Sequence, residues 1–136
     1  MSDKAWEKAM ALAQQANLEV LRGNPEPIKL LYSHRDDVTV LGGFGGFERG
    51  WNEVGPRLDW AASHFSDGRY GQEDVSAIIG ADLAMTVTIE RYSVRIDGGS
   101  ETAQELRVTQ VFRLEDGAWK LVHRHADPLV RRQSPE

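Results

Sequence analysis

Apolar and polar residues alternate most regularly over residues 105–127, and this alternation predicts two strands joined by a tight turn. The turn falls at Asp116 and Gly117, because this pair tolerates the positive φ angles that a type I′ hairpin turn requires. Side chains alternate between the two faces of a strand, so pairing residues outward from the turn assigns each one to a face. One face carries Phe112 and Trp119 next to the turn, and we expect it to point into the protein.

The same pairing places polar side chains at the far end of the inward face: Gln110, His123, His125 and Asp127. A buried polar group without a partner costs about 1–3 kcal/mol, so these residues are expected either to satisfy one another or to hold a ligand. The outward face mixes charged and apolar residues and is predicted to meet water or a partner: Arg107, Thr109, Val111, Arg113, Lys120, Val122, Arg124 and Ala126.

Three helices are predicted before the long strands. Apolar residues recur at spacings of three and four over residues 3–22, and Gly23 is a typical helix stop. A short helix is expected over residues 24–32 and a third helix over residues 52–65. Three side chains on these helices either line a ligand pocket or serve the structure alone: Tyr32, Trp60 and His64.

The glycine-rich stretch at residues 42–47 follows a predicted strand at residues 38–41 but does not fit a nucleotide-binding loop. Glu48 stands where the dinucleotide-binding fingerprint requires its third glycine, and no Gly-Lys-Ser/Thr sequence follows. A tight turn between two short strands is predicted instead, with Phe44 and Phe47 as candidate lids of a pocket or as core residues.

Two further strands are predicted over residues 69–79 and 83–96, with turns between them. Neither face of the second strand is cleanly apolar. Either Glu90 or Arg91 therefore has to point inward, and both are candidate ligand-binding residues.

Composition narrows the range of functions. The chain has 136 residues, which suits one domain with its own core, and the absence of cysteine excludes disulfides and favours a cytoplasmic location. A net charge of −5 without a basic patch argues against nucleic acid as a partner. No apolar run approaches the roughly 18 residues of a membrane span, so no membrane partner is expected.

The predicted order of helices and strands indicates an α+β fold with helices on one face of a curved antiparallel sheet. That order, the Asp37-Val38 entry into the first strand, the strand at residues 84–90 and the ending DGAWKLVHRHAD resemble the SnoaL-like branch of the nuclear transport factor 2 superfamily, which also includes ketosteroid isomerase. The resemblance extends from about Trp6 to Leu129, and Trp-x-x-Val-His-x-His is its most specific part. The chain also resembles the association domain of calcium/calmodulin-dependent protein kinase II.

The resemblance implies a cone-shaped roll, in which a strongly bent sheet wraps around three helices and a deep pocket opens at one end. It implies a single domain at residues 1–130, a flexible tail at residues 131–136, and a homodimer through the outer face of the sheet. Where enzymes of this superfamily use an aspartate base inside the pocket, the resemblance implies Asp127 as the nearest match, with His125 or His123 beside it. No cofactor is expected.

Two functions fit these features. In the first, an isomerase or lyase uses His125 and Asp127 to move a proton beside a carbonyl group of a hydrophobic substrate, while Gln110 or Tyr32 stabilises the oxyanion. In the second, the chain is a non-catalytic ligand-binding or dimerisation module. The expected ligand is a small hydrophobic or carboxylate-bearing molecule.

A metal site is a third, less favoured interpretation. His123, His125 and Asp127 would lie in a line along one strand, and ligands in a line converge on a metal ion only with help from elsewhere, such as His64. No metal ion is therefore expected.

Overall fold

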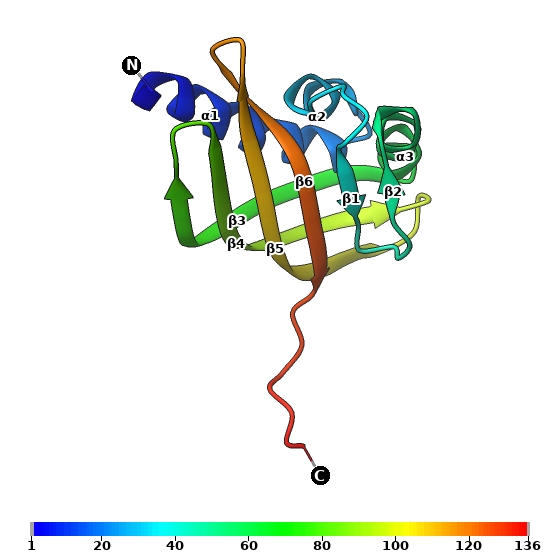
Figure 1. Cartoon of the computed structure of the whole chain (residues 1–136). Helices are drawn as coiled ribbons and strands as arrows, with labels where there is room; N and C mark the ends of the chain where they lie inside the picture. The colour runs from blue at the N-terminus through cyan, green and yellow to red at the C-terminus, as the bar shows by residue number, and fades with distance from the viewer. Residues whose placement is uncertain (1, 136) are drawn as a thin grey trace.

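The computed structural model describes residues 2–135, and Figure 1 shows one strongly bent sheet with the helices on one side of it. The elements follow the predicted order: α1 (Ser2–Val20), α2 (Glu26–Leu31), β1 (Thr39–Leu41), β2 (Glu48–Arg49), α3 (Trp51–Ser63), β3 (Phe65–Ile79), β4 (Leu83–Ile96), β5 (Glu101–Glu115) and β6 (Ala118–Pro128). The α+β class predicted from the sequence is confirmed.

The six strands form one sheet in the order β2-β1-β6-β5-β4-β3. The four long strands β3 to β6 pair antiparallel in sequence order, whereas β1 lies parallel to β6. The predicted turn joins β5 to β6, with φ of 50° at Asp116 and 80° at Gly117. The tight turn predicted at residues 42–47 is also present, because the two short strands that flank it, β1 and β2, pair antiparallel.

The core lies between α1, α2, α3 and the concave face of the sheet. Trp6 of α1 packs edge-on against Phe112 and Trp119, with ring centroids 5.3 and 5.5 Å apart. Phe112 and Trp119 are buried, as the pairing of the hairpin predicts. Gly68 lets β3 pass directly against the end of α1, because a Cβ atom at this position would collide with Leu21.

A β-bulge in β6 reverses the predicted facing of its second half. Phe112 pairs with Leu121, but the next residue of β5, Val111, pairs with His123, so Val122 has no partner of its own. One extra residue in a strand exchanges the two faces beyond it, because side chains alternate with a period of two. The prediction that His123, His125 and Asp127 face inward is therefore wrong, as is the outward assignment of Arg124 and Ala126.

The bulge leaves β5 unaffected, and the inward face predicted for that strand is confirmed. Leu106, Val108, Gln110 and Phe112 are all buried. On β4, Thr86, Thr88 and Glu90 are also buried, whereas Arg91 points outward. Arg91 binds Glu73 of β3 and Glu105 of β5, so it ties three strands together on the outer face.

Candidate functional site

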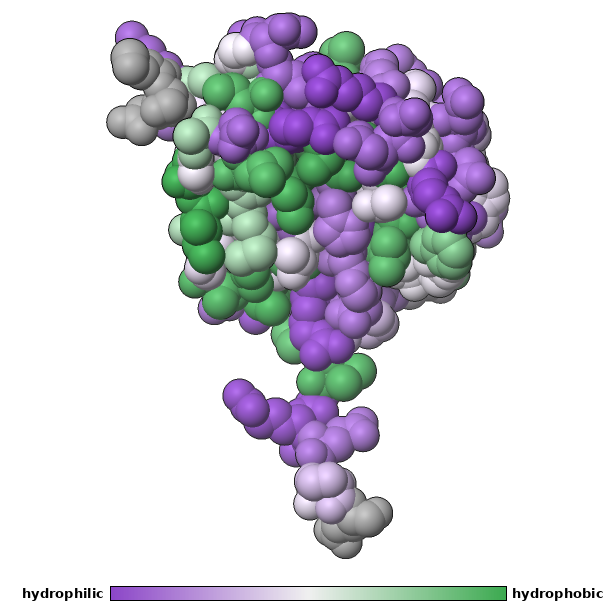
Figure 2. Space-filling model, viewed as in Figure 1, coloured by the Kyte–Doolittle hydropathy of each residue, from purple (hydrophilic) through white to green (hydrophobic). Residues whose placement is uncertain are grey.

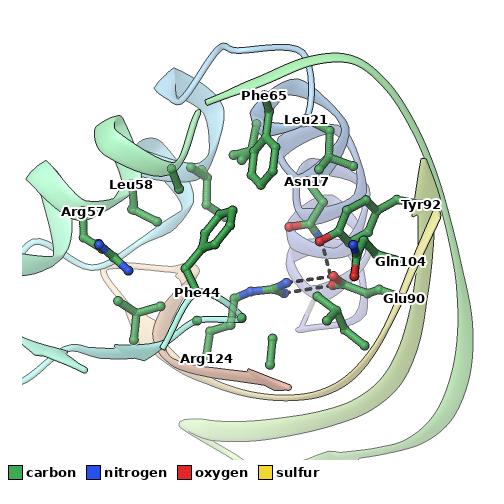
Figure 3. A pocket seen from close by; sticks show the side chains of 18 of the residues that line it. Asn17, Leu21, Phe44, Arg57, Leu58, Phe65, Glu90, Tyr92, Gln104 and Arg124 are labelled. Carbon is green, nitrogen blue, oxygen red and sulfur yellow. Dashed lines mark hydrogen bonds and ion pairs between the residues drawn. The ribbon is translucent and has the colours of Figure 1, made fainter. Parts of the chain in front are cut away.

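A cavity of about 290 Å³ lies between α1, α3, the turn after β1 and the concave face of the sheet; we call it the first cavity. Its wall is mostly apolar and includes Val20, Ile28, Val40, Leu58, Phe65 and Leu106. Phe44 leans over it from the turn between β1 and β2 (Figure 3). A concave, mostly apolar site with a few polar groups is typical of small-molecule binding.

The polar centre of the first cavity is an ion pair between Glu90 of β4 and Arg124 of β6 (Figure 3). Arg124 donates from Nη2 to Glu90 Oε1 at 2.7 Å and from Nη1 to Glu90 Oε2 at 2.9 Å. The Glu90 side chain is 3% exposed and the Arg124 side chain 15% exposed. The two-pronged geometry matches the fork of the guanidinium to the carboxylate, which makes this the strong form of an ion pair.

Three further residues extend this pair into a network. Asn17 of α1 donates to Glu90 Oε2 at 3.4 Å and to the Tyr70 hydroxyl at 3.1 Å. Tyr70 in turn donates to Gln72. Burial, reinforced by the nearby Glu90 carboxylate, raises the pKa of Tyr70 far above its ordinary value, so the hydroxyl keeps its proton.

Arg124 keeps its positive charge in this environment. Burial opposes the charge, but Glu90 outweighs burial and raises the pKa of Arg124 above its ordinary value. Arg124 also donates to Gln110 Oε1 at 3.0 Å. The guanidinium is therefore held by Gln110 of the neighbouring strand β5 and by Glu90 of β4, the strand beyond it.

An aromatic cluster surrounds the mouth of the first cavity. The Phe44 ring lies 5.4 Å from Trp60 and 5.6 Å from Phe65. Arg57 stacks over Trp60 at 3.9 Å and also lines the cavity. Phe44 is 49% exposed, which suits a lid that contacts both the solvent and the cavity.

The first cavity brings together only two of the residues predicted for the site. Phe44 and Glu90 line it. Gln110 lies behind the ion pair, bound to Arg124, and Arg91 lies on the outer face.

The remaining aromatic candidates lie outside the first cavity. Tyr32 is buried and donates to the Thr39 carbonyl, so it belongs to the core. Phe47 is 66% exposed and is not part of the cavity wall. Trp60 and His64 contact each other near the mouth, and His64 binds Asp97 at 2.5 Å.

His123, His125 and Asp127, the predicted catalytic residues, lie on the outer face of the sheet. His123 Nδ1 shares a hydrogen bond with the Thr39 hydroxyl at 2.7 Å, and burial together with the neighbouring His125 lowers the pKa of His123. Asp127 accepts two hydrogen bonds from Arg107. Within residues 2–135, no three histidine or acidic side chains are grouped in a way that could hold a metal ion.

Sequence reasoning missed most of the polar residues of the cavity: Asn17, Tyr70, Tyr92, Gln104 and Arg124. Asn17 did carry a signal, because it interrupts the apolar stripe of the first helix. The sequence gives no comparable signal for Arg124, because the inward direction of its side chain depends on the bulge at Val122.

The family model of the SnoaL-like domain matches residues 10–130. No curated protein matches the chain. Among solved structures, a nuclear transport factor 2-like superfamily protein from Salmonella enterica is similar with a TM-score of 0.80 at 17% identity, covering 97% of this chain and 95% of that one. A putative dehydratase of the same superfamily from Streptomyces avermitilis has a TM-score of 0.79 at 21% identity, covering 94% and 96% of the two chains.

A third structure is titled a putative calcium/calmodulin-dependent protein kinase II association domain, from Xanthomonas campestris. It has a TM-score of 0.71 at 16% identity and covers 90% of this chain and 86% of that one. At these identities the likeness shows the fold, whereas the family-model match confirms the SnoaL-like resemblance predicted from the sequence. Within the described residues, no helix is long and apolar enough to cross a membrane.

Proposed function

Because the chain belongs to the SnoaL-like domain family, we propose that it binds a small, uncharged and mostly apolar molecule in the first cavity. The hydroxyl or carbonyl group of this molecule meets the polar centre formed by Glu90 and Arg124. The observation that carries the proposal is the presence of this paired, buried charge in a mostly apolar wall.

The balance of charge favours an uncharged ligand. Glu90 neutralises Arg124, and at the mouth Glu48 lies 3.7 Å from Arg57. A ligand carboxylate would have to displace Glu90 from Arg124 and leave a buried acid without its partner, which is costly. Of the two ligand classes expected from the sequence, the hydrophobic molecule is therefore favoured over the carboxylate.

Free hydrogen-bonding capacity beside the pair indicates where the ligand's polar group is held. Glu90 accepts two hydrogen bonds from Arg124 and one from Asn17, and a carboxylate has about four acceptor positions. Tyr92 and Gln104 line the cavity next to Glu90 (Figure 3), and within residues 2–135 neither side chain is engaged in a hydrogen bond. Both side chains are therefore available to form hydrogen bonds with the ligand.

Proton transfer by Glu90 is a second candidate function. Glu48 and Glu90 are the carboxylates of the cavity wall, and only Glu90 is buried. The Streptomyces neighbour is titled a putative dehydratase, and a general base can promote loss of water by removing a proton from the carbon next to the one that carries the leaving hydroxyl group. In this proposal Glu90 replaces His125 and Asp127 as the acid-base group of an isomerase or lyase, because those two side chains lie outside the cavity.

The test compares three probes of similar size: 1-naphthol, 1-tetralone and 1-naphthoate. We expect the two uncharged probes to bind saturably, as measured by calorimetry and by shifts of the Trp60 indole resonance, and the carboxylate to bind at least tenfold more weakly. Glu90→Gln should weaken the uncharged probes, whereas Glu73→Gln on the outer face should not. Tight binding of 1-naphthoate, or no saturable binding by either uncharged probe, would refute the proposal.

Turnover separates the two candidate functions. Mass spectrometry and proton exchange into deuterated water, followed on 1-tetralone, report abstraction of a proton beside the carbonyl group. Exchange that is lost in Glu90→Gln supports catalysis, and binding without exchange supports a ligand-binding module.

We also propose that two copies pair through the outer face of the sheet. Hydrophobic side chains gather where the end of β3 and the start of β4 lie (Figure 2). Ile78, Met85 and Val111 form one row across β3, β4 and β5 on this face, and Ile78 is 61% exposed. The similarity to a structure titled an association domain agrees with assembly.

Light scattering tests this pairing. A dimer has twice the 15.2 kDa of the chain, about 30 kDa. Met85→Glu should give a monomer, and Ala11→Glu on the exposed side of α1 should not. A wild-type monomer at micromolar concentration would contradict the proposal.

A further inference from the structure

A second cavity, of about 240 Å³, lies on the other side of the Glu90–Arg124 pair, between the N-terminal half of α1 and strands β3, β4 and β5. Gln110 and Gln72 belong to its wall. Gln110 binds Arg124 and Gln72 binds Tyr70, and both of these partners line the first cavity. One layer of hydrogen-bonded side chains therefore separates the two cavities.

The second cavity contains a buried hydroxyl group without a partner. Thr86 lines it and is 6% exposed, and its Oγ1 atom is buried without a hydrogen bond to any described residue. Leaving a buried hydroxyl unsatisfied is unfavourable. A threonine of this kind needs a partner that enters the cavity.

Gln110 adds a hydrogen-bond donor to the same wall. Arg124 has only donors, so the Gln110 atom that it binds has to be the oxygen, and the orientation of this amide is settled. The Gln110 amide nitrogen is then left to donate, and no acceptor for it is found within residues 2–135. Thr86 and Gln110 are therefore both available to bind an oxygen atom.

The rest of the wall sets the size and charge of the occupant. Trp6, Met10 and Ala13 of α1 form an apolar side. At the rim, Asp74 accepts from Gln72 through Oδ1, which leaves Oδ2 for a further donor. A cavity of roughly 150 Å³ accommodates benzene, so this larger one has room for a single ring with a short polar substituent.

We propose that the second cavity is a separate binding site for a small uncharged carboxamide with an apolar body. Its carbonyl oxygen accepts from Thr86 and Gln110, its amide N–H group donates to Asp74, and its apolar part contacts Trp6 and Met10. A single water molecule would satisfy Thr86 but would leave the apolar side of the cavity uncovered. A carboxylate would place a second negative charge beside Asp74.

The test uses benzamide with the 136-residue chain labelled with nitrogen-15. The indole resonance of Trp6 reports the second cavity, and that of Trp60, which contacts Phe44, reports the mouth of the first. We expect a saturable shift of the Trp6 resonance with benzamide and none with benzoate at the same concentration. The two indole reporters make failure of this site distinguishable from failure of the first.

Thr86→Val removes the hydroxyl at nearly constant shape. It should weaken benzamide binding about three- to tenfold, the value of one neutral hydrogen bond, while raising the melting temperature of the free protein by removing an unsatisfied group. Thr109→Val is the matched control, because Thr109 lies on the outer face of β5 and its loss should leave benzamide binding unchanged. Ala77→Phe, at the exposed rim of the cavity, is a second variant that should block binding without touching the core.

Three results would count against the proposal. If benzamide gives no saturable shift of Trp6 in the wild type, the cavity holds water only. If benzamide binds equally well to Thr86→Val and Ala77→Phe, the Trp6 shift arises elsewhere. Equal binding of benzoate would refute the assigned role of Asp74.

Discussion

Replacing Arg124 with methionine should destabilise the protein far more than its position on a strand would suggest. The change leaves the Glu90 carboxylate, whose side chain is 3% exposed, with Asn17 as its remaining hydrogen-bond donor. Removing one partner of a buried ion pair typically costs about 3–5 kcal/mol. Small domains are stable by only about 5–15 kcal/mol, so this loss should lower the melting temperature by roughly 10–20 °C.

An ion pair on the outer face of the sheet, which also includes a residue of β6, provides a matched control. Arg107 of β5 binds Asp127 of β6 with two hydrogen bonds of 3.0 and 3.1 Å, so the geometry resembles that of the buried pair. Its side chains are 57% and 40% exposed, however, and an exposed pair contributes about 0–1 kcal/mol. Arg107→Met should therefore change stability little.

Urea unfolding followed by tryptophan fluorescence measures both variants. A double variant, Glu90→Leu with Arg124→Met, should recover much of the lost stability, because two apolar side chains leave no unpaired charge. If Arg124→Met and Arg107→Met lose the same amount, the Glu90–Arg124 pair is not the buried, mutually dependent unit described above.

Three other changes test the packing and the outer face. Trp119→Ala should cost about 3–5 kcal/mol in urea unfolding, because Trp119 is buried against Trp6; a loss below about 1 kcal/mol would contradict its place in the core. His125→Ala should change the free energy of unfolding by less than about 0.5 kcal/mol and leave 1-naphthol binding intact, because the side chain is 48% exposed on the outer face. Loss of 1-naphthol binding would mean that His125 contributes to the binding site after all. The pKa of His123 is lowered in the folded protein, so as the pH falls below about 6.5 the unfolded chain binds a proton before the folded chain does. The free energy of unfolding should therefore decrease with falling pH until the folded-state pKa is passed. His123→Gln should remove this part of the pH dependence in thermal melts.

The sequence was sufficient to predict elements whose pattern is local. The hairpin turn at Asp116 and Gly117 follows from backbone preferences, and the inward face of β5 follows from uninterrupted alternation. The prediction remained correct on β6 as far as Leu121 and was wrong beyond Val122. No glycine or proline marks the bulge, and a shift of one residue reverses every later side chain.

The choice between Glu90 and Arg91 required contacts that are distant in the sequence. Both residues lie on one strand with mixed faces, so periodicity could not decide between them. In the structure Arg91 meets carboxylates on both neighbouring strands of the outer face, and Glu90 meets Arg124 inside. Each charge lies where an opposite charge from another strand is available.

The bulge and the buried pair explain each other. Without the extra residue at Val122, Asp127 would join Glu90 on the inner face and Arg124 would turn toward the outer face. Two acids would then share the interior without a cation, and like charges in a poorly solvated site repel strongly. The bulge costs one unpaired strand residue, but it brings the guanidinium of Arg124 to the carboxylate that β4 has already buried. The register of β6, and with it the polar centre of the first cavity, is therefore selected by a pair of charges 34 residues apart in the chain rather than by the alternation of the strand itself.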